Sequence, residues 1–276
     1  MITENSGGYD LVEPSILAVY GSKLRLAILD ALAEKPMSLS DLRRKVNANA
    51  PNTSSKAKDL EELGMVERKQ GAYELTPWGR AVQRRTIKTA SFFSAYEKHK
   101  DFWESHITSG IPPELWDDLG DLDDAYIIGT SPTNVVQLHE AFIEALNSAK
   151  SHVHGMTPLY QEAYFQAAVS WVQNKIPAKV ILTDEILKIC ADRAGKDIVQ
   201  LCDTADTLRL FAYPKLPVAI MVSEASFTLA LESTGKTASF VDMNLWSKNQ
   251  KAMDWGIRLF EYYKASSKPV KLGDYL

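Results

Sequence analysis

His152 and His154 are the residues whose type and spacing come closest to those of a metal site. On a strand, two residues of this spacing share one face, and two imidazoles on one face are a common start of a zinc site. We find no third ligand at a convincing spacing. The pair Cys190 and Cys202 does not have the spacing of a zinc knuckle either. We therefore predict no metal and no cofactor. The two cysteines fit a reducing compartment as small core residues, with a redox pair as the sharper alternative.

Nucleic-acid recognition is the second chemistry that the residue types allow. The chain carries a net charge of −4, yet residues 36–90 hold 11 Lys+Arg against 6 Asp+Glu. Inside that basic stretch lies "NTSSKAK" at positions 52–58, in which an amide and hydroxyls stand beside lysines. Amides read adenine edges, and lysines and arginines contact phosphates. We predict a DNA-binding surface from ten residues: Asn52, Ser54, Ser55, Lys56, Lys58, Arg43, Arg44, Lys45, Arg68 and Lys69.

The elements that must position these residues follow from periodicity and capping signals. Apolar residues at helical spacing predict a helix over 15–34, and Lys35-Pro36 ends it. Ser38 is the expected N-cap of a second helix, and a third runs from about Pro51 to Leu63. Two short strands joined at Gln70-Gly71 follow. Three helices and a hairpin in this order are typical of a winged helix-turn-helix, whose recognition helix would carry Asn52, Ser55 and Lys56 on one outward side.

This segment also resembles a known family. "SKLRLAILDALAEKPMSLSDLRRKV" followed by "LEELGMVERKQGAYELTPWGRAV" is similar to the DNA-binding domain of ArsR-like archaeal and bacterial regulators. The resemblance implies binding to double-stranded DNA. Some winged helices bind protein instead, so a protein-interaction module remains an alternative.

A connector follows the hairpin. No breaker stands between Gly79 and His106, which predicts one long helix. Its seam of Val82, Thr86, Thr89, Phe93 and Tyr96 is spaced for pairing with a second copy of the chain. A homodimer would place two recognition helices about 34 Å apart, one turn of DNA. The alternative is that the aromatic residues of the connector pack on the C-terminal domain.

The C-terminal part alternates strands with helices. The predicted strands lie in "AYIIG", "HVHGMTP", "AKVILT", "TLRLFAY", "VAIMVSE" and "SFTLALES", and the last two form a hairpin near Ala225. The predicted helices cover 132–150, 159–175, 184–194 and 248–265. This order implies an α/β sheet with parallel pairs and an antiparallel end. The residues that directly follow these strands lie where such sheets bind ligands. We name five of them as a candidate effector pocket: His154, Thr157, Tyr160, Thr183 and Asp184.

Two further resemblances concern this part. "HKDFWESHITSGIPPELWDDLGDL", the β-α units and "AMDWGIRLFEYYK" are similar to the archaeal family of filament and methanogenesis regulators, which implies a transcriptional regulator with a "middle" domain. "LPVAIMVSEASFTLALES" resembles half of a phospholipase-D-like domain, whose catalytic motif is H-x-K-x4-D. With Glu224 in the acid position, Pro217 and Ala219 replace its His and Lys. We therefore expect no catalytic residue and no enzyme, with a phosphodiesterase-like enzyme fused to a DNA-binding domain as the alternative.

The sequence as a whole predicts an α+β protein of two domains. We expect a winged helix-turn-helix over 1–80, a connector helix and linker over 81–124, and an α/β regulatory domain over 125–276 that senses an effector or dimerises. That last domain would be a phospholipase-D-like half without the catalytic motif. The expected partners are operator DNA, a second copy of the chain and a small-molecule effector, with no membrane and a cytoplasmic location.

Overall fold

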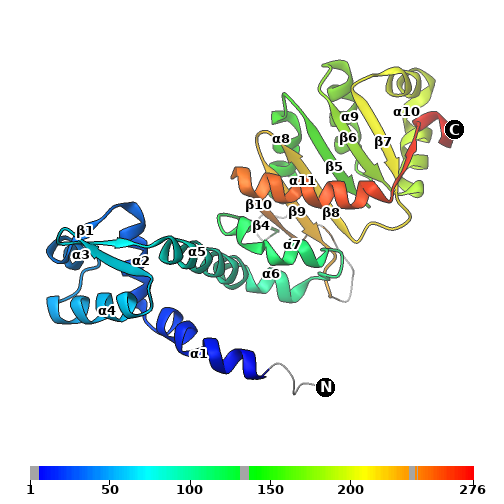
Figure 1. Ribbon diagram of the computed structural model, residues 1–276. Helices are drawn as coiled ribbons and strands as arrows, with labels where there is room; N and C mark the ends of the chain where they lie inside the picture. Colours follow the sequence, from blue (N-terminus) through cyan, green and yellow to red (C-terminus); the bar gives the residue numbers. More distant parts are fainter. Residues whose placement is uncertain (1–5, 131–136, 236–239, 241) are drawn as a thin grey trace. The chain divides into compact units, whose positions relative to one another are not determined.

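The computed structural model describes residues 6–130, 137–235, 240 and 242–276. The chain divides into two compact units, Met1–Ala90 and Ser91–Leu276, each with its own hydrophobic core (Figure 1). The predicted connector, 81–124, is therefore no separate body, because its residues are divided between these two cores. Within the described residues, no helix is both long and apolar enough to cross a membrane.

The N-terminal unit is built from helices and one small sheet. The predicted single helix over 15–34 is two helices, because the chain breaks at Gly21 and Ser22 caps the second one by accepting a hydrogen bond from the Arg25 N–H. A Cβ on Gly21 would lie 2.5 Å from the Leu17 carbonyl oxygen, so the turn requires glycine. The helices are α1 (Ser6–Tyr20), α2 (Lys23–Glu34), α3 (Leu39–Lys45), α4 (Ala50–Glu62) and α5 (Pro77–Lys98).

Side-chain caps fix where α3 and α4 begin. The Ser38 hydroxyl accepts from the Asp41 N–H, as predicted, and the Asn49 side chain accepts from the Asn52 N–H. Gly64, which follows α4, has a φ of 67°, the left-handed conformation that ends helices. The short connection between α3 and α4 uses Asn47 at a φ of 51°, a conformation that asparagine tolerates.

The hairpin forms at the predicted turn. Gln70 and Gly71 have φ values of 49° and 83°, and two positive φ values in sequence are the signature of a type I′ turn. An additional two-residue strand, too short to predict from periodicity, pairs with the hairpin and gives the sheet order β1-β3-β2. The strands are β1 (Met37–Ser38), β2 (Val66–Lys69) and β3 (Ala72–Leu75).

The predicted helix over 79–106 ends early. α5 stops at Lys98, and α6 (Lys100–Ser105) begins after a break at the buried residue His99. The His99 ring lies 2.8 Å from the Ala125 carbonyl oxygen, a contact from far along the chain that periodicity cannot reveal. Two short helices follow: α7 (Pro113–Asp117) and the 3₁₀ helix η1 (Leu119–Leu122). Segment 91–122 thereby contributes Phe102, Leu119 and Leu122 to the core of the C-terminal unit.

An eight-stranded sheet organises the C-terminal unit. Its order is β11-β7-β6-β5-β8-β9-β10-β4, with β5, β6 and β7 parallel and the remaining pairs antiparallel, as predicted for the β8–β9 hairpin. β10 and β11 are additional to the strands predicted from the sequence. The strands are β4 (Tyr126–Gly129), β5 (Val153–Thr157), β6 (Ala178–Leu182), β7 (Leu208–Ala212), β8 (Val218–Ser223), β9 (Phe227–Leu231), β10 (Met243–Ser247) and β11 (Lys268–Val270).

Helices cover both faces of this sheet (Figure 1). α8, α9 and α10 lie on one face, and α11 lies on the other together with α6, α7 and η1. α10 consists of two helical pieces, because Gly195, at a φ of 69° and a ψ of 162°, is not helical. The first piece ends at 194, as predicted, and the second continues to Thr204. The first residues of the predicted helix 132–150 lie outside the described ranges. The helices are α8 (Gln137–Ser148), α9 (Glu162–Gln173), α10 (Asp184–Thr204), α11 (Gln250–Ala265) and η2 (Leu272–Tyr275).

Candidate nucleic-acid interface and ligand cavity

The rotation of α4 is fixed by its buried stripe. Thr53, Ala57 and Leu60 are fully buried against the core of the N-terminal unit. The opposite side of the helix therefore faces solvent, and Ser55 and Lys58 lie near its centre. Asn52 is exposed in the first turn, beside the capped N-terminus of the helix. The exposed face of α4 thus carries the Asn52 amide and the Ser55 hydroxyl that the sequence predicted there, together with the ammonium of Lys58, which was predicted on a flank.

Lys56 lies elsewhere than predicted. It occupies the flank of α4 that faces α2. From there it reaches Asp59, three residues further along the same helix. The Lys56 Nζ is 3.1 Å from the Asp59 carboxylate, and the same oxygen lies 2.8 Å from the Arg25 guanidinium of α2. Lys56 is therefore part of an ion-pair group that joins two helices and does not stand beside Ser55 on the outward face. Ser54, on the other flank, is half-buried.

The basic residues of α3 are all exposed at its C-terminal end. Arg44 pairs with Asp41, and Lys45 pairs with Glu34 at 2.8 Å. Arg43 has no ion pair among the described residues. Cations in the last turn of a helix also interact favourably with its dipole, so these side chains have a local structural role besides any phosphate contact.

The hairpin of β2 and β3, which would be the wing of a winged helix, carries the remaining two predicted residues. Arg68 lies over the Tyr73 ring, 5.5 Å from its centroid. Lys69 contacts Glu67 at 2.7 Å and Glu74 at 2.6 Å, and these hydrogen bonds raise the pKa of the Lys69 ammonium. Because both carboxylates offset its charge, Lys69 contributes less positive potential than the sequence suggested. α5 adds further exposed cations within the N-terminal unit, at Arg80, Arg84, Arg85 and Lys88.

The C-terminal unit contains a cavity of about 530 Å³ between the sheet and helices α8, α9 and α10. Its walls are mostly apolar, with Phe142 from α8, Phe165 from α9 and Ile186 from α10 among them. Its floor is the helix-covered face of the sheet, where Gly155 and Ala219 lie on the neighbouring strands β5 and β8.

Only two of the five predicted effector-pocket residues line this cavity. Thr157 and Tyr160 do, whereas His154, Thr183 and Asp184 do not. His154 and Thr157 are an odd number of positions apart on β5, so strand alternation places them on opposite faces of the sheet. Thr183 is the N-cap of α10, and Asp184 accepts a hydrogen bond of 2.5 Å from the Tyr275 hydroxyl. Thr183 therefore stabilises the start of α10, and Asp184 joins that start to η2.

His154 faces α11 instead. Its ring packs edge-on against Phe260, with centroids 5.0 Å apart, and His152 lies 5.6 Å away. Burial, together with the nearby charges of Lys179 and His152, lowers the pKa of His154 to about 4. The imidazole is accordingly neutral at neutral pH. Among the described residues, no group of three His, Cys, Asp or Glu side chains is placed to hold a metal ion.

Residues at the three phospholipase-D-like positions have other roles. The Glu224 carboxylate accepts from the backbone N–H groups of Lys150 and Ser151, at 2.7 and 3.2 Å, and from the Ser151 hydroxyl. Partial burial opposes ionisation, but these hydrogen bonds hold the pKa of Glu224 at about 2. Pro217 precedes β8, and Ala219 presents a methyl group to the cavity. The pair of cysteines on α10 is buried, which raises the thiol pKa values to about 12 for Cys190 and about 11 for Cys202.

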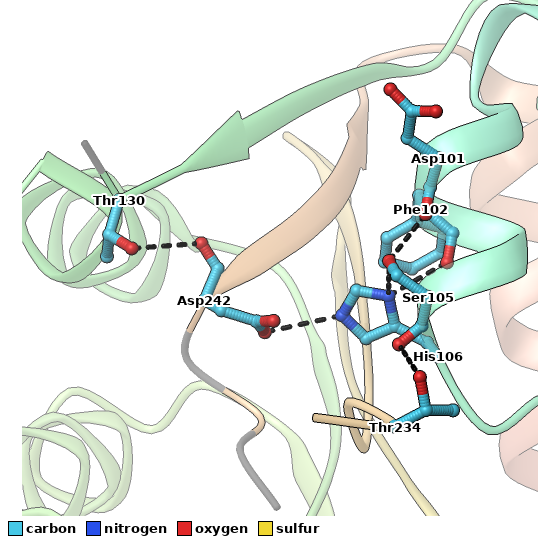
Figure 2. Close-up of polar contacts among 7 residues, drawn as sticks. All are labelled: Asp101, Phe102, Ser105, His106, Thr130, Thr234 and Asp242. Carbon is cyan, nitrogen blue, oxygen red and sulfur yellow. Dashed lines mark hydrogen bonds and ion pairs between the residues drawn. The ribbon is translucent and has the colours of Figure 1, made fainter. Parts of the chain in front are cut away.

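A buried histidine that the sequence analysis overlooked connects the cavity rim to α6 (Figure 2). The His106 Nδ1 is 2.8 Å from the Phe102 carbonyl oxygen, and its Nε2 is 3.3 Å from the Asp242 carboxylate. The Asp242 carbonyl oxygen accepts from the hydroxyl of Thr130, a residue that lines the cavity. Thr234 donates its hydroxyl to the Ser105 carbonyl at 2.9 Å. These contacts join the ends of β4 and β9 to the segment after α6.

Comparisons with known sequences find matches to both parts of the chain. Residues 135–266 match the family described as "Methanogenesis regulatory protein FilR1, middle domain", and residues 15–97 match the "HVO_A0261 N-terminal domain". The methanogenesis regulatory protein FilR1 of Methanothrix harundinacea (strain 6Ac) is 24% identical over 267 residues. That alignment covers 92% of this chain and 57% of the relative, so the chain spans little more than half the length of that protein. The predicted resemblance to the methanogenesis regulators is confirmed.

Solved structures of distant proteins are also similar. TrmBL2, an archaeal chromatin protein, aligns with a TM-score of 0.44 at 15% identity, over 95% of this chain and 99% of its own. Nuc from Salmonella typhimurium, a phospholipase D family member, aligns with a TM-score of 0.38 at 10% identity, over 53% of this chain and 99% of its own.

Proposed function

From a chain that joins a middle domain of the FilR1 type to an N-terminal domain of the HVO_A0261 type, we propose a DNA-binding transcription regulator. The observation that carries the proposal is the outward face of α4. Asn52, Ser55 and Lys58 are presented to solvent on the second helix of a helix-turn-helix, and the opposite face of that helix is locked in the core. A helix of this kind reads base edges in the major groove with the residues of its N-terminal half.

The other predicted residues support this role as phosphate contacts. Arg43, Arg44 and Lys45 lie at the end of α3, and Arg68 lies on the wing, all with exposed side chains. Contacts of this type fix the position of a protein on DNA without reading its sequence. Because Arg44 and Lys45 already pair with carboxylates, we expect a moderate number of released counterions on binding.

Fluorescence anisotropy of the protein on labelled DNA from upstream of its own gene tests the proposal, with shuffled DNA of the same composition as control. We expect tighter binding to the upstream DNA and a log affinity that falls with log salt by about 0.9 per phosphate contact. Weak and equal binding to both DNAs at low salt would reject a sequence-reading regulator and favour a protein-interaction module.

The regulator would act as a homodimer, and α1 is the surface that supports this. Its apolar residues are distributed all round the helix, and of those whose side chains are described only Val19 is buried. Leu11 is 83% exposed and Leu17 is 58% exposed. A helix that is apolar on every side is normally covered by a neighbour. A second copy of the chain is the proposed neighbour, since a dimer would offer two recognition helices to two half-sites.

The predicted connector seam is a weaker candidate for this contact. Thr86 is buried, and Thr89 contacts the Tyr20 hydroxyl of α1 at 3.2 Å, so these positions are occupied within the same chain. Val82 packs against the core of the N-terminal unit. Of the five seam residues, Phe93 is the large apolar side chain that stays exposed, at 59%.

Leu17→Asp tests the dimer through α1. An unpaired carboxylate at an apolar interface costs free energy on association, so the dimer dissociation constant should rise by about 10-fold or more. Sedimentation or light scattering over a dilution series measures it. Leu17→Met, which keeps the apolar surface, is the matched control. A dilution curve that coincides with that of the unaltered protein would move the interface away from α1.

A further inference from the structure

The sheet of the C-terminal unit is incompletely filled on one face. β5, β6 and β8 are central strands, and helices lie over both faces of the sheet. Even so, Gly155, Val180 and Ala219 are only partly buried on the side facing α8, α9 and α10. Protein interiors are packed about as densely as organic crystals, and few voids exceed a water molecule. A cavity of about 530 Å³ at this position is therefore an exception that calls for an occupant.

Small residues create the space. A Cβ on Gly155 would meet nothing closer than the Val180 side chain at 3.9 Å, so neither crowding nor a positive φ requires glycine here. Ala219 pairs with Ala230 on the neighbouring strand, and both line the cavity. Glycine in a strand interior weakens the strand, and it commonly marks a place where a ligand approaches the backbone.

The walls determine what the cavity accepts. Of its lining residues that the structure describes, none is Asp, Glu, Lys or Arg. Most are aliphatic or aromatic. The polar ones include His139 of α8, Thr228 of β9 and Asn244 of β10, and a further polar group lies where β5 ends. There Thr157 uses its hydroxyl oxygen to accept from the Leu159 N–H at 3.0 Å, which leaves its proton for an acceptor. The Gln161 amide, on the same rim, makes no capping bond to α9.

We infer that this cavity is a binding site for an uncharged, largely apolar small molecule whose hydrogen-bonding end lies at Thr157 and Gln161. The volume is within the range of sites that enclose drug-sized ligands. A charged ligand is disfavoured, because an ion removed from water needs a counter-ion, and the described lining residues offer only the imidazole of His139 in place of any Asp, Glu, Lys or Arg side chain. Glu162, next to the rim, is already bound by the Tyr160 hydroxyl at 2.7 Å and by Gln166.

Binding is measurable on the whole 276-residue chain without DNA. N-phenyl-1-naphthylamine is a neutral probe whose emission rises in apolar surroundings, and we expect a saturable rise at one probe per chain. Competitors of equal chain length separate the ligand classes at neutral pH. Decanol should displace the probe, and decanoate and decylammonium should need about 10-fold higher concentrations or more. An anion or cation that competes as well as decanol would overturn the assignment to uncharged ligands.

Variants locate the site. Gly155→Val adds a β-branched side chain that a strand favours and that projects into the cavity, so probe affinity should fall by about 10-fold or more. Gly155→Ala, whose added methyl group has room, should bind almost normally and is the matched control. Ala219→Leu fills the same space from β8 and serves if Gly155→Val does not fold. A folded filling variant that binds the probe with unchanged affinity would place the site elsewhere, and a rise that never saturates would remove the site altogether.

A role of this cavity in regulating DNA binding rests on the proposed function. Ligand binding in the cavity and DNA binding by the protein can nevertheless be rejected separately. DNA affinity is measured with and without decanol in the unaltered protein and in Gly155→Val. If the probe binds and no DNA does, the regulator is rejected and the cavity remains. If DNA binds and the probe does not, the cavity proposal is rejected alone.

Discussion

Gly79→Ala should destabilise the N-terminal unit by about 3 kcal/mol, at the upper end of the cost of overpacking. A Cβ at this position would lie 1.8 Å from the Met65 carbonyl oxygen and 2.8 Å from the carbonyl carbon. The obstacle is backbone, so no side-chain rotation relieves the clash. The first turn of α5 or the end of the α4–β2 connection must move.

Movement of the Met65 carbonyl has a second cost. Its oxygen accepts from the Thr76 N–H at 3.1 Å, and Thr76 caps α5 by accepting from the Gly79 N–H at 3.0 Å. The substitution therefore disturbs the cap that begins α5 together with the packing of its first turn. A domain of this size loses about 4–8 °C of melting temperature per kcal/mol, so a shift on the order of 15 °C is expected.

Hydrogen exchange of the amides in α4 and β2 reports this unit separately from the larger one. Arg80→Ala, in the same turn of α5 with an exposed side chain, is the control and should leave their protection unchanged. Equal protection in Gly79→Ala and Arg80→Ala would mean that the backbone of α5 accommodates a methyl group without strain, contrary to the geometry.

Ser55→Glu should reduce DNA affinity by about 100-fold or more at low salt, with little change in melting temperature. The residue lies near the centre of the solvent-facing side of α4, where an added carboxylate meets the phosphates and base edges of the groove. Its side chain has no hydrogen bond to lose among the described residues, so the expected effect is on binding alone.

Two variants calibrate this result. Ser55→Ala removes only the hydroxyl and should cost about 1–3 kcal/mol at most, if that hydroxyl contacts a base. Lys58→Ala should weaken binding to all DNAs alike and reduce the salt slope by about 1, as expected for one lost phosphate contact. Anisotropy titrations at several salt concentrations measure all three. Unchanged affinity in Ser55→Glu would show that α4 is not the DNA-reading element.

The parts of the fold that sequence could predict are those with local signals. Ser38 caps α3 and the hairpin turns at Gln70-Gly71, as predicted, because caps and turns are encoded within a few residues. α4 begins at Ala50, one residue before the predicted start at about Pro51. β1, β10 and β11 were missed, since a short strand is defined mainly by its partner. The break at His99 depends on the carbonyl of Ala125, 26 positions away.

In the candidate sites too, features with local sequence signals were predictable and features that depend on distant residues were not. Helical periodicity placed Asn52 and Ser55 correctly on the outer face of α4, but Lys56 lies on a flank because Asp59 and Arg25 hold its ammonium there. Strand alternation alone could have separated His154 from Thr157. The cavity could not be predicted, because its described lining comes mainly from α8, α9, α10, η2 and the six strands β5 to β10, which meet only in the folded unit. The one local cue was glycine in the middle of "HVHGMTP".

The segment before β4 bears on how this protein can be divided. Residues 91–125 lie outside the match to the FilR1 middle domain, yet they close the core of the C-terminal unit. The Trp255 indole donates to the Leu115 carbonyl at 2.9 Å, and the Tyr263 hydroxyl donates to the Gly110 carbonyl at 2.6 Å. A fragment trimmed to the boundaries shared with relatives would expose one side of α11 to water. The Trp255 indole and the Tyr263 hydroxyl would lose the carbonyl groups that accept their hydrogen bonds. The segment that can be transferred as an intact folding unit, by gene fusion or by cloning, therefore begins within α5. This start lies some forty residues before the boundary that sequence similarity indicates.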